Sequence, residues 1–291
     1  MSSITISHLR KTYGRHTAVD DLTLTVPEGS VFGLLGPNGS GKSTTFKCLL
    51  GLTRPNSGDV RIDGVPLTPI AFESLAYVPE KSVLYDWMTV AEHVESTRRS
   101  FTRFDRGRCL SLLAQFGVDP SKRVRTLSKG MKTATQAALA FARSPRLMIL
   151  DEPTSGLDPV NQRIVLNLIV EAAANGSTVV FSSHQVGQVE RAAERIAILK
   201  LGKLILEGQV DDLKAARKIV EGVVEESFAL NGLAGDARIA YVERDSRIIR
   251  IHCNSDADAL ATELGARGAV GVRVLDLGLE DIFFTAVSEG K

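Results

Sequence analysis

A glycine-rich segment near the N-terminus has the composition of a phosphate-binding loop. It follows the apolar residues 31–35 and consists of Gly36, Pro37, Asn38, Gly39, Ser40, Gly41, Lys42, Ser43 and Thr44. Glycines let backbone N–H groups approach phosphates, and the N-terminus of a following helix attracts negative charge. Lys42 supplies a positive charge for the β- and γ-phosphates of a triphosphate, and the Ser43 hydroxyl suits Mg²⁺. The alternative, a glycine-rich turn with a chance lysine, is disfavoured by the strand expected before the loop and the helix expected over 44–50.

Two carboxylates follow a second apolar run. Residues 147–150 are continuously apolar, which is typical of a strand buried on both faces of a parallel sheet, and Asp151 and Glu152 come directly after them. The carboxyl ends of parallel strands meet at one edge of the sheet, where the phosphate loop also lies. We expect Asp151 to hold Mg²⁺, directly or through water, and Glu152 to polarise an attacking water as general base. The alternative interpretation is an acidic loop that simply follows a core strand. The phosphate loop expected at the same edge of the sheet makes that interpretation less favourable.

Strand and helix patterns alternate over most of the chain. Strands are expected over 4–26 with a turn at 13–16, and over 57–64, 178–182 and 195–199. Helices are expected over 90–99, 108–116, 161–174 and 185–193. This alternation predicts an α/β fold with a mainly parallel core sheet covered by helices.

The C-terminal part, residues 220–291, changes character. It predicts a small α/β domain with a hairpin of 238–243 and 247–252, a capping box at 255–258, a strand at 270–277 and a helix at 279–287. His252 and Cys253 are adjacent and would face opposite sides of a strand, which makes a poor metal pair. A regulatory or subunit-contact role and a purely structural extension both remain open for this domain.

Composition excludes several classes of protein. The chain has 291 residues with 35 Lys plus Arg and 34 Asp plus Glu, for a formal charge of +1, so a nucleic-acid-coating protein is not expected. Three separated cysteines form no C-x-x-C pair, which argues against a disulfide framework and a zinc site. The N-terminus does not read as a signal peptide, and no run approaches the ~20 apolar residues of a membrane helix.

Four further motifs carry a resemblance to a known family: 11–14 (KTYG), 127–131 (LSKGM), 155–158 (SGLD) and His184 after the strand at 178–183. With the phosphate loop, they make residues 4–213 resemble the ATP-binding-cassette (ABC) ATPases. The resemblance implies that Tyr13 stacks on adenine and that His184 contacts the γ-phosphate, although a lone histidine is more often structural. It also implies that Ser128 and Gly130 close over ATP bound by a partner subunit, and that 155–158 crosses the dimer interface.

This chain departs from the family pattern at several positions. Glu80 stands where the family usually has a glutamine that binds Mg²⁺; it can still ligate the metal, but it adds negative charge near a triphosphate. The motif 127–131 resembles the family's signature sequence. Lys129 replaces a glycine of that signature, and its side chain either helps the facing phosphate or points to solvent. Met131, Thr133 and Ala134 replace commonly polar residues.

Residues 80–92 include the only tryptophan, Trp87, together with Tyr85. In the family this region borders the groove that receives a helix of the membrane subunit, so an exposed aromatic side chain there would anchor docking. Ordinary packing between the helical insert and the sheet is the equally weighted alternative.

The resemblance implies an ATP-hydrolysing subunit, with ATP and Mg²⁺ as cofactors, that works as a dimer with a second ABC ATPase, preferably a second copy. The expected fold is a P-loop ABC cassette over 1–215 with an antiparallel β subdomain and a helical insert at about 87–143, followed by the small domain at 220–291. A separately encoded transmembrane permease would hold the protein at the cytoplasmic face of the membrane, and the pattern is most similar to ABC-2-type exporters. The alternatives are a soluble, non-transport ABC ATPase and a weakly hydrolysing regulatory cassette.

Overall fold

The computed structural model describes residues 3–66, 73–225, 227–228 and 236–288. The chain divides into two compact units, Met1–Glu207 and Gly208–Lys291, each with its own fold. This division places the boundary ahead of helix α7 (Val210–Ala216), so that helix belongs to the second unit.

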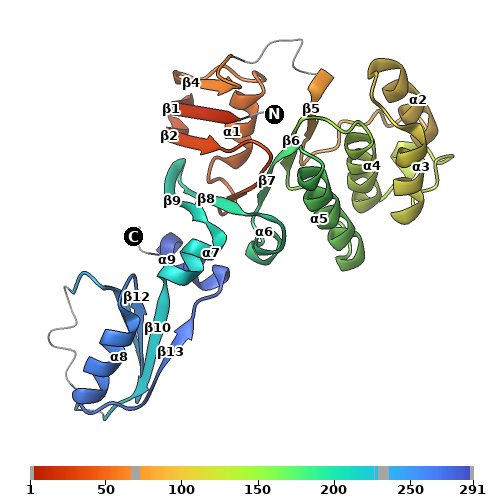
Figure 1. Cartoon of the computed structure of the whole chain (residues 1–291). Coiled ribbons are helices and arrows are strands. Elements are labelled where there is room, and N and C mark those ends of the chain that lie inside the picture. The colour runs from red at the N-terminus through yellow and green to blue at the C-terminus, as the bar shows by residue number, and fades with distance from the viewer. Residues whose placement is uncertain (1–2, 67–72, 226, 229–235, 289–291) are drawn as a thin grey trace. The chain divides into compact units, whose positions relative to one another are not determined.

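The first unit begins with a three-stranded antiparallel sheet in the order β2-β1-β4 (Figure 1). Strands β1 (Ile4–Tyr13) and β2 (His16–Val26) form the hairpin predicted from the sequence, and β4 (Ser57–Ile62) pairs antiparallel with β1. Alternate side chains of β1 and β2 are buried, as expected for a sheet with one face on a core.

A six-stranded sheet in the order β5-β6-β7-β3-β8-β9 forms the centre of this unit. Its strands are β3 (Val31–Leu35), β5 (Leu75–Val78), β6 (Leu147–Asp151), β7 (Thr178–Ser183), β8 (Arg195–Lys200) and β9 (Lys203–Gln209). The pairings β5–β6, β6–β7, β7–β3 and β3–β8 are parallel. Every residue of β3, β6 and β7 is buried, which explains why these strands are mostly apolar, with polar residues at the ends of β6 and β7.

Parallel pairing brings three strand ends together at one edge of this sheet. Leu35 pairs with Ser183, and Asp151 pairs with Ser182. The chain leaves these ends as the phosphate loop, as Glu152 and as His184, so three segments far apart in the sequence meet there.

Helices cover the sheet and build the insert. Helix α1 (Lys42–Leu49) leads from β3 to β4, whereas α5 (Pro159–Ala174) connects β6 to β7 and α6 (Val186–Ala192) connects β7 to β8. The insert contains α2 (Val90–Ser100), α3 (Arg106–Gln115), the 3₁₀ helix η2 (Val124–Thr126) and α4 (Lys129–Phe141), which form a group to one side of the sheet (Figure 1). The expected α/β cassette fold with an antiparallel subdomain and a helical insert is confirmed.

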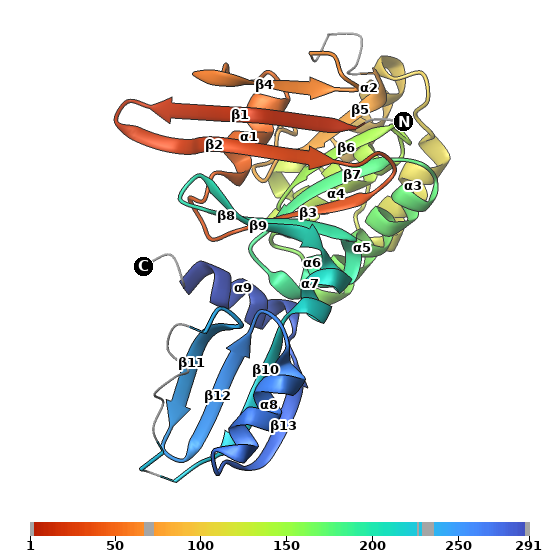
Figure 2. The ribbon, with the colours of Figure 1, turned by 60° about the vertical axis from the view of Figure 1, so that its left-hand side comes forward.

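The second unit is a four-stranded antiparallel sheet in the order β11-β12-β10-β13 (Figure 2). Its strands are β10 (Lys218–Val223), β11 (Ile239–Asp245), β12 (Ile248–Cys253) and β13 (Val270–Asp276), and its helices are α7, α8 (Ala257–Ala266) and α9 (Leu279–Ser288). The predicted hairpin, third strand and closing helix are present.

Two expectations for the C-terminal region were incomplete or wrong. Strand β10 was not predicted, although it is central and pairs with both β12 and β13. The capping box at 255–258 is absent: α8 begins one residue later than that box requires, and Asp256 precedes it in a left-handed conformation with no side-chain cap. In the part of the chain that the structure describes, no helix combines the length and apolar character needed to cross a membrane.

Candidate active site

A pocket of about 450 Å³ lies at the edge where the three strand ends meet. It brings together most of the residues predicted from the sequence: Tyr13, Asn38, Gly39, Ser40, Gly41, Lys42, Ser43, Thr44, Glu80, Glu152 and His184. His16, Ala18 and Ser155 complete the lining. Tyr13, residues 38–44 of the phosphate loop, the candidate base Glu152 and His184 therefore share one cavity, whereas Gly36 and Pro37 do not line it.

The phosphate loop has the backbone conformation that its glycines permit. Gly41 precedes α1 with a φ of +107°, and a Cβ there would lie 2.5 Å from the carbonyl oxygen of Ala18. A larger residue would push the loop away from β2. The buried Ser40 hydroxyl has no hydrogen-bond partner among the described residues, so a donor remains for a ligand in this loop.

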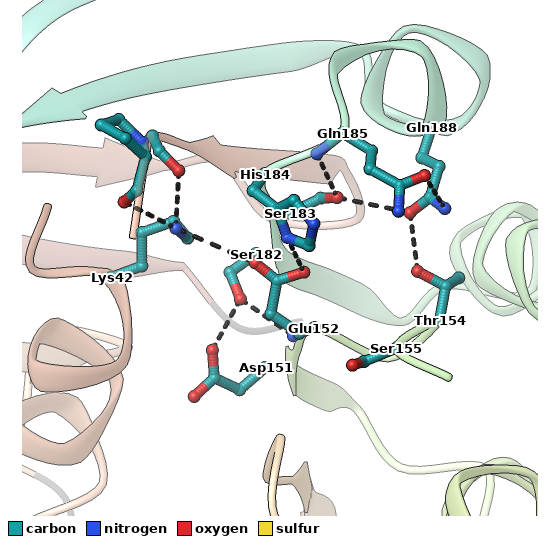
Figure 3. Close-up of polar contacts among 12 residues, drawn as sticks. Lys42, Asp151, Glu152, Thr154, Ser155, Ser182, Ser183, His184, Gln185 and Gln188 are labelled. Carbon is teal, nitrogen blue, oxygen red and sulfur yellow. Dashed lines mark hydrogen bonds and ion pairs between the residues drawn. The ribbon is translucent and has the colours of Figure 1, made fainter. Parts of the chain in front are cut away.

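The Lys42 ammonium is buried and held by the loop itself. Its Nζ donates to the carbonyl oxygens of Gly36 at 2.7 Å and Pro37 at 3.3 Å, and it lies 3.8 Å from Glu152 Oε1 (Figure 3). Burial lowers the pKa of Lys42, while the carboxylates of Glu152 and Asp151 oppose that shift. A triphosphate entering the pocket would meet a desolvated cation, which binds anions strongly.

Glu152 is fixed between a lysine and a histidine. Its Oε2 lies 2.9 Å from His184 Nδ1, and its backbone has a φ of +50°, in the left-handed region that favours glycine. The backbone N–H of Glu152 donates to Ser182 Oγ at 3.0 Å, and Ser182 in turn donates to Asp151 Oδ1 at 2.7 Å (Figure 3). Strain of this kind persists only where surrounding contacts determine it, and here it aims the carboxylate into the pocket.

The candidate metal ligands lie partly in the lining of the pocket and partly buried outside the lining. Ser43 and Glu80 line the pocket, whereas Asp151 is buried and does not contribute to the lining. No group of three His, Cys, Asp or Glu side chains suited to a metal occurs among the described residues. Mg²⁺ in nucleotide sites commonly uses one or two protein oxygens and takes the rest from phosphates and water, so this sparse donor set fits that ion.

The signature residues Ser128 and Gly130 lie outside the pocket of their own chain. Ser128 caps α4 by accepting from the Met131 N–H at 3.2 Å. Gly130 packs on the 155–158 loop so closely that a Cβ would lie 2.4 Å from the Gly156 carbonyl oxygen. Lys129 donates to Ser155 Oγ at 2.9 Å, so its side chain binds this loop in addition to being exposed to solvent.

Sequence reasoning missed the hydroxyl network behind the carboxylates. Ser182 bridges Asp151 and Glu152, and Gln188 accepts from Thr154 at 2.6 Å and from Ser183 at 3.3 Å. The signal was the pair of serines that ends an otherwise apolar strand, because buried hydroxyls need partners.

A phosphate loop that joins a buried parallel strand to a helix, with a carboxylate pair at the end of a strand in the same sheet, defines a P-loop nucleoside triphosphatase. The family described as "ABC transporter" matches residues 19–155. The Nod factor export ATP-binding protein I of Rhizobium etli is 35% identical over 296 residues, covering 97% of this chain and 92% of that protein. The uncharacterized ABC transporter ATP-binding protein YhaQ of Bacillus subtilis is 37% identical over 216 residues, covering 72% of each chain.

Solved structures agree with this. An ATP-binding subunit of an ABC transporter is 32% identical with a TM-score of 0.66 and covers 73% of this chain and 92% of that one. The ATP-binding cassette MJ0796, a dimer in a post-hydrolysis state with ADP and Pi, is 25% identical with a TM-score of 0.64. The match covers 71% of this chain and 98% of that one. The chain belongs to the ABC transporter family, as an ATP-binding subunit that hydrolyses ATP to power transport.

Proposed function

We propose that two copies of this chain close around two ATP molecules, each bound in the pocket of one copy and covered by Ser128 and Gly130 of the other. The observation that carries the proposal is that these two residues lie at the N-terminus of α4 and outside their own chain's pocket, which Lys42, Glu152 and His184 line. Such a site is complete only when a second cassette supplies the N-terminus of its helix α4, whose backbone N–H groups can bind the phosphates. The cassette MJ0796 is a dimer with ADP and Pi bound, which supports the pairing of two cassettes.

Within each site, different side chains bind the nucleotide, accept the proton and hold the metal. Lys42 binds the β- and γ-phosphates, and Tyr13, half-exposed with Lys11 Nζ 4.9 Å from its ring, offers a face to adenine. Glu152 accepts a proton from the attacking water, and His184, 2.9 Å from it, positions that carboxylate and contacts the γ-phosphate. Ser43, Asp151 and Glu80 would hold Mg²⁺, which neutralises charge on the phosphates when bound.

Cassette closure would move a separately encoded permease, with this subunit peripheral to the membrane. We favour export, because the relatives include Nod factor export proteins and the lantibiotic transport ATP-binding protein SrtF of Streptococcus pyogenes. The contact among Lys42, Glu152 and His184 argues against a regulatory cassette without hydrolysis, since all three groups are in place for catalysis.

An aromatic pair offers the docking anchor for the permease. Trp87 and Tyr85 are 68% and 62% exposed, and their rings stack with centroids 5.8 Å apart. The Tyr85 ring also stacks on His93 of α2, and the Tyr85 N–H donates to His93 Nε2 at 3.1 Å. Packing between the insert and the sheet does not account for this exposure, whereas a rigid exposed aromatic pair suits a protein interface.

Trp87→Ala is therefore expected to weaken binding to the cognate permease by about thirtyfold, as loss of an interface anchor does. The ATPase activity of the isolated subunit should not change. Co-purification and permease-stimulated ATP hydrolysis measure the two effects. Leu52→Ala removes a comparably exposed apolar side chain and serves as the control. Normal coupling in the Trp87 variant would assign docking to another surface.

Mixing two inactive variants tests the shared site directly. Lys42→Ala removes the phosphate-binding charge, and Ser128→Arg places a large side chain at the helix N-terminus that would cover the partner's ATP, at an exposed position outside the pocket of its own chain. Each variant alone is expected to lack hydrolysis, because both sites of its homodimer are damaged. A dimer with one copy of each has one intact site, so an equal mixture should recover roughly a quarter of the wild-type rate. A mixture as inactive as its components would contradict a site shared between copies.

A further inference from the structure

The four-stranded sheet of the second unit has one covered face and one that is open in part. Helix α8 packs on the covered face, where Leu260 and Leu264 join a core with Val220, Ile249 and Ile251. The intervening residues of the strands point to the opposite face. Helix α9 reaches one end of that face, where Thr285 Oγ1 lies 3.5 Å from the Tyr241 hydroxyl.

A row of four charged side chains crosses the open face perpendicular to the strands. We call it the charged row; in strand order β11-β12-β10-β13 it consists of Glu243, Arg250, Glu221 and Arg273, which are paired in register. Arg250 Nε lies 2.7 Å and Arg273 Nη2 lies 2.6 Å from the Glu221 carboxylate. The signs therefore alternate, negative-positive-negative-positive, from one edge of the sheet to the other.

An apolar row lies directly beside the charged row. It consists of Ile248, Val223 and Val270, which are 38%, 46% and 69% exposed, and Val223 pairs with both of the others. At the β11 edge, Ile248 also pairs with the exposed Asp245. Cross-strand pairing alone explains why neighbouring charges alternate. It does not explain three adjoining apolar side chains left in solvent on the same face, which indicate a surface that a partner covers.

We propose that this face binds the same face of a second copy of the chain. A two-fold axis parallel to the strands, passing between β12 and β10, reverses the order of the strands and preserves the position of each row. The charged row of one copy then lies opposite the charged row of the other in reversed order, so each of its four charges faces an opposite charge. Asp245 lies opposite the partner's Val270, at the edge of the contact. The same axis brings Ile248 opposite the partner's Val223. A row with an even number of alternating charges is complementary to its own reverse. A partner with another order of charges would place like charges opposite each other.

Two rows over four strands make a small contact. Stable interfaces bury about 1,600 Å² in total, so this face alone predicts a weak dimer. Its effect is to raise the local concentration of one cassette near another, without contributing to either nucleotide site. This contact is thus separate from the ATP-dependent sandwich and forms in the nucleotide-free protein.

Charge reversal at the two ends of the charged row tests the proposal. Glu243 lies on β11 and Arg273 on β13, with β12 and β10 between them, so the two side chains cannot pair within one chain. In the proposed dimer they face each other twice, once on each side of the axis. Self-association of the full-length, nucleotide-free protein is measured by sedimentation equilibrium at low ionic strength for the wild type, Glu243→Arg, Arg273→Glu and an equal mixture of the two variants.

Each single reversal is expected to weaken the dimer on the order of tenfold, because it places like charges opposite each other at two symmetric positions. The mixture should associate as the wild type does, since the arginine introduced at position 243 of one copy then faces the glutamate introduced at position 273 of the other. Asp258→Arg and Arg267→Glu reverse exposed charges on α8 and at its end, and should have no effect. Thermal melting of each variant checks the fold, because Arg273→Glu also removes the pair with Glu221. A wild type that stays monomeric at high concentration, single variants that associate normally, or a mixture as weak as its components would each overturn the proposal.

Discussion

Replacing Glu152 with glutamine is expected to slow ATP hydrolysis by roughly 10²–10⁴-fold while ATP binding is retained. The amide has nearly the same shape and can still contact His184, but it cannot accept a proton from the attacking water. It also removes a negative charge 3.8 Å from Lys42 Nζ, which favours binding of the triphosphate. Phosphate release at saturating ATP and Mg²⁺ measures the rate, and a fluorescent ATP analogue measures binding.

Glu171→Gln provides the matched control, because Glu171 is an exposed carboxylate on α5 that pairs with Arg108 away from the pocket. Its rate should equal that of the wild type. Unchanged turnover in Glu152→Gln would remove Glu152 from the role of general base, whatever its contact with His184.

Changing Lys42 to alanine is expected to weaken ATP binding on the order of a hundredfold and to abolish hydrolysis. The ammonium is already desolvated and held by the Gly36 and Pro37 carbonyls, so no further desolvation of this group opposes its interaction with phosphate. Without it, the Glu152 carboxylate would lie near the γ-phosphate without the ammonium that lies 3.8 Å from it. Titration calorimetry with ATP gives the affinity directly.

Lys47→Ala changes an exposed lysine of the same helix and should leave ATP affinity unaltered. If Lys42→Ala bound ATP as tightly as the wild type, the pocket would derive its phosphate affinity from the loop backbone alone, and Lys42 would not be the phosphate-binding cation.

The features that local sequence encodes strongly were predicted well. Residues 147–150 are apolar because β6 is buried on both faces, and this pattern located Asp151 and Glu152 at a strand end. The glycines of the phosphate loop predicted a helix directly after them; α1 begins at Lys42, two residues before the expected start at Thr44. Parallel pairing then fixed which strand ends meet, so the pocket followed from a few rules about sheets.

Contacts between distant segments could not be predicted in the same way. Nothing near Lys129 indicates that its ammonium binds Ser155, and nothing near Ser182 identifies Asp151 as its acceptor. The sequence pattern does not predict strand β10, because Glu221 and Gly222 interrupt its apolar residues. A Cβ at Gly222 would lie 3.3 Å from Val272 Cγ2 and 3.4 Å from Leu264 Cδ2, so the space at this position is set by the facing helix and the neighbouring strand.

The joining of two copies of this chain by ATP is tested most directly by the dimerisation of the Glu152→Gln protein. Its mass is measured by light scattering after size exclusion with ATP and Mg²⁺, and the same protein with Lys42→Ala added is the control. Salt is raised until the ATP-free protein is monomeric, so that only nucleotide-dependent association is scored. We expect a dimer that requires ATP and disappears when Lys42 is replaced. A monomer under all conditions, or a dimer that forms equally well without Lys42, would contradict the shared ATP site.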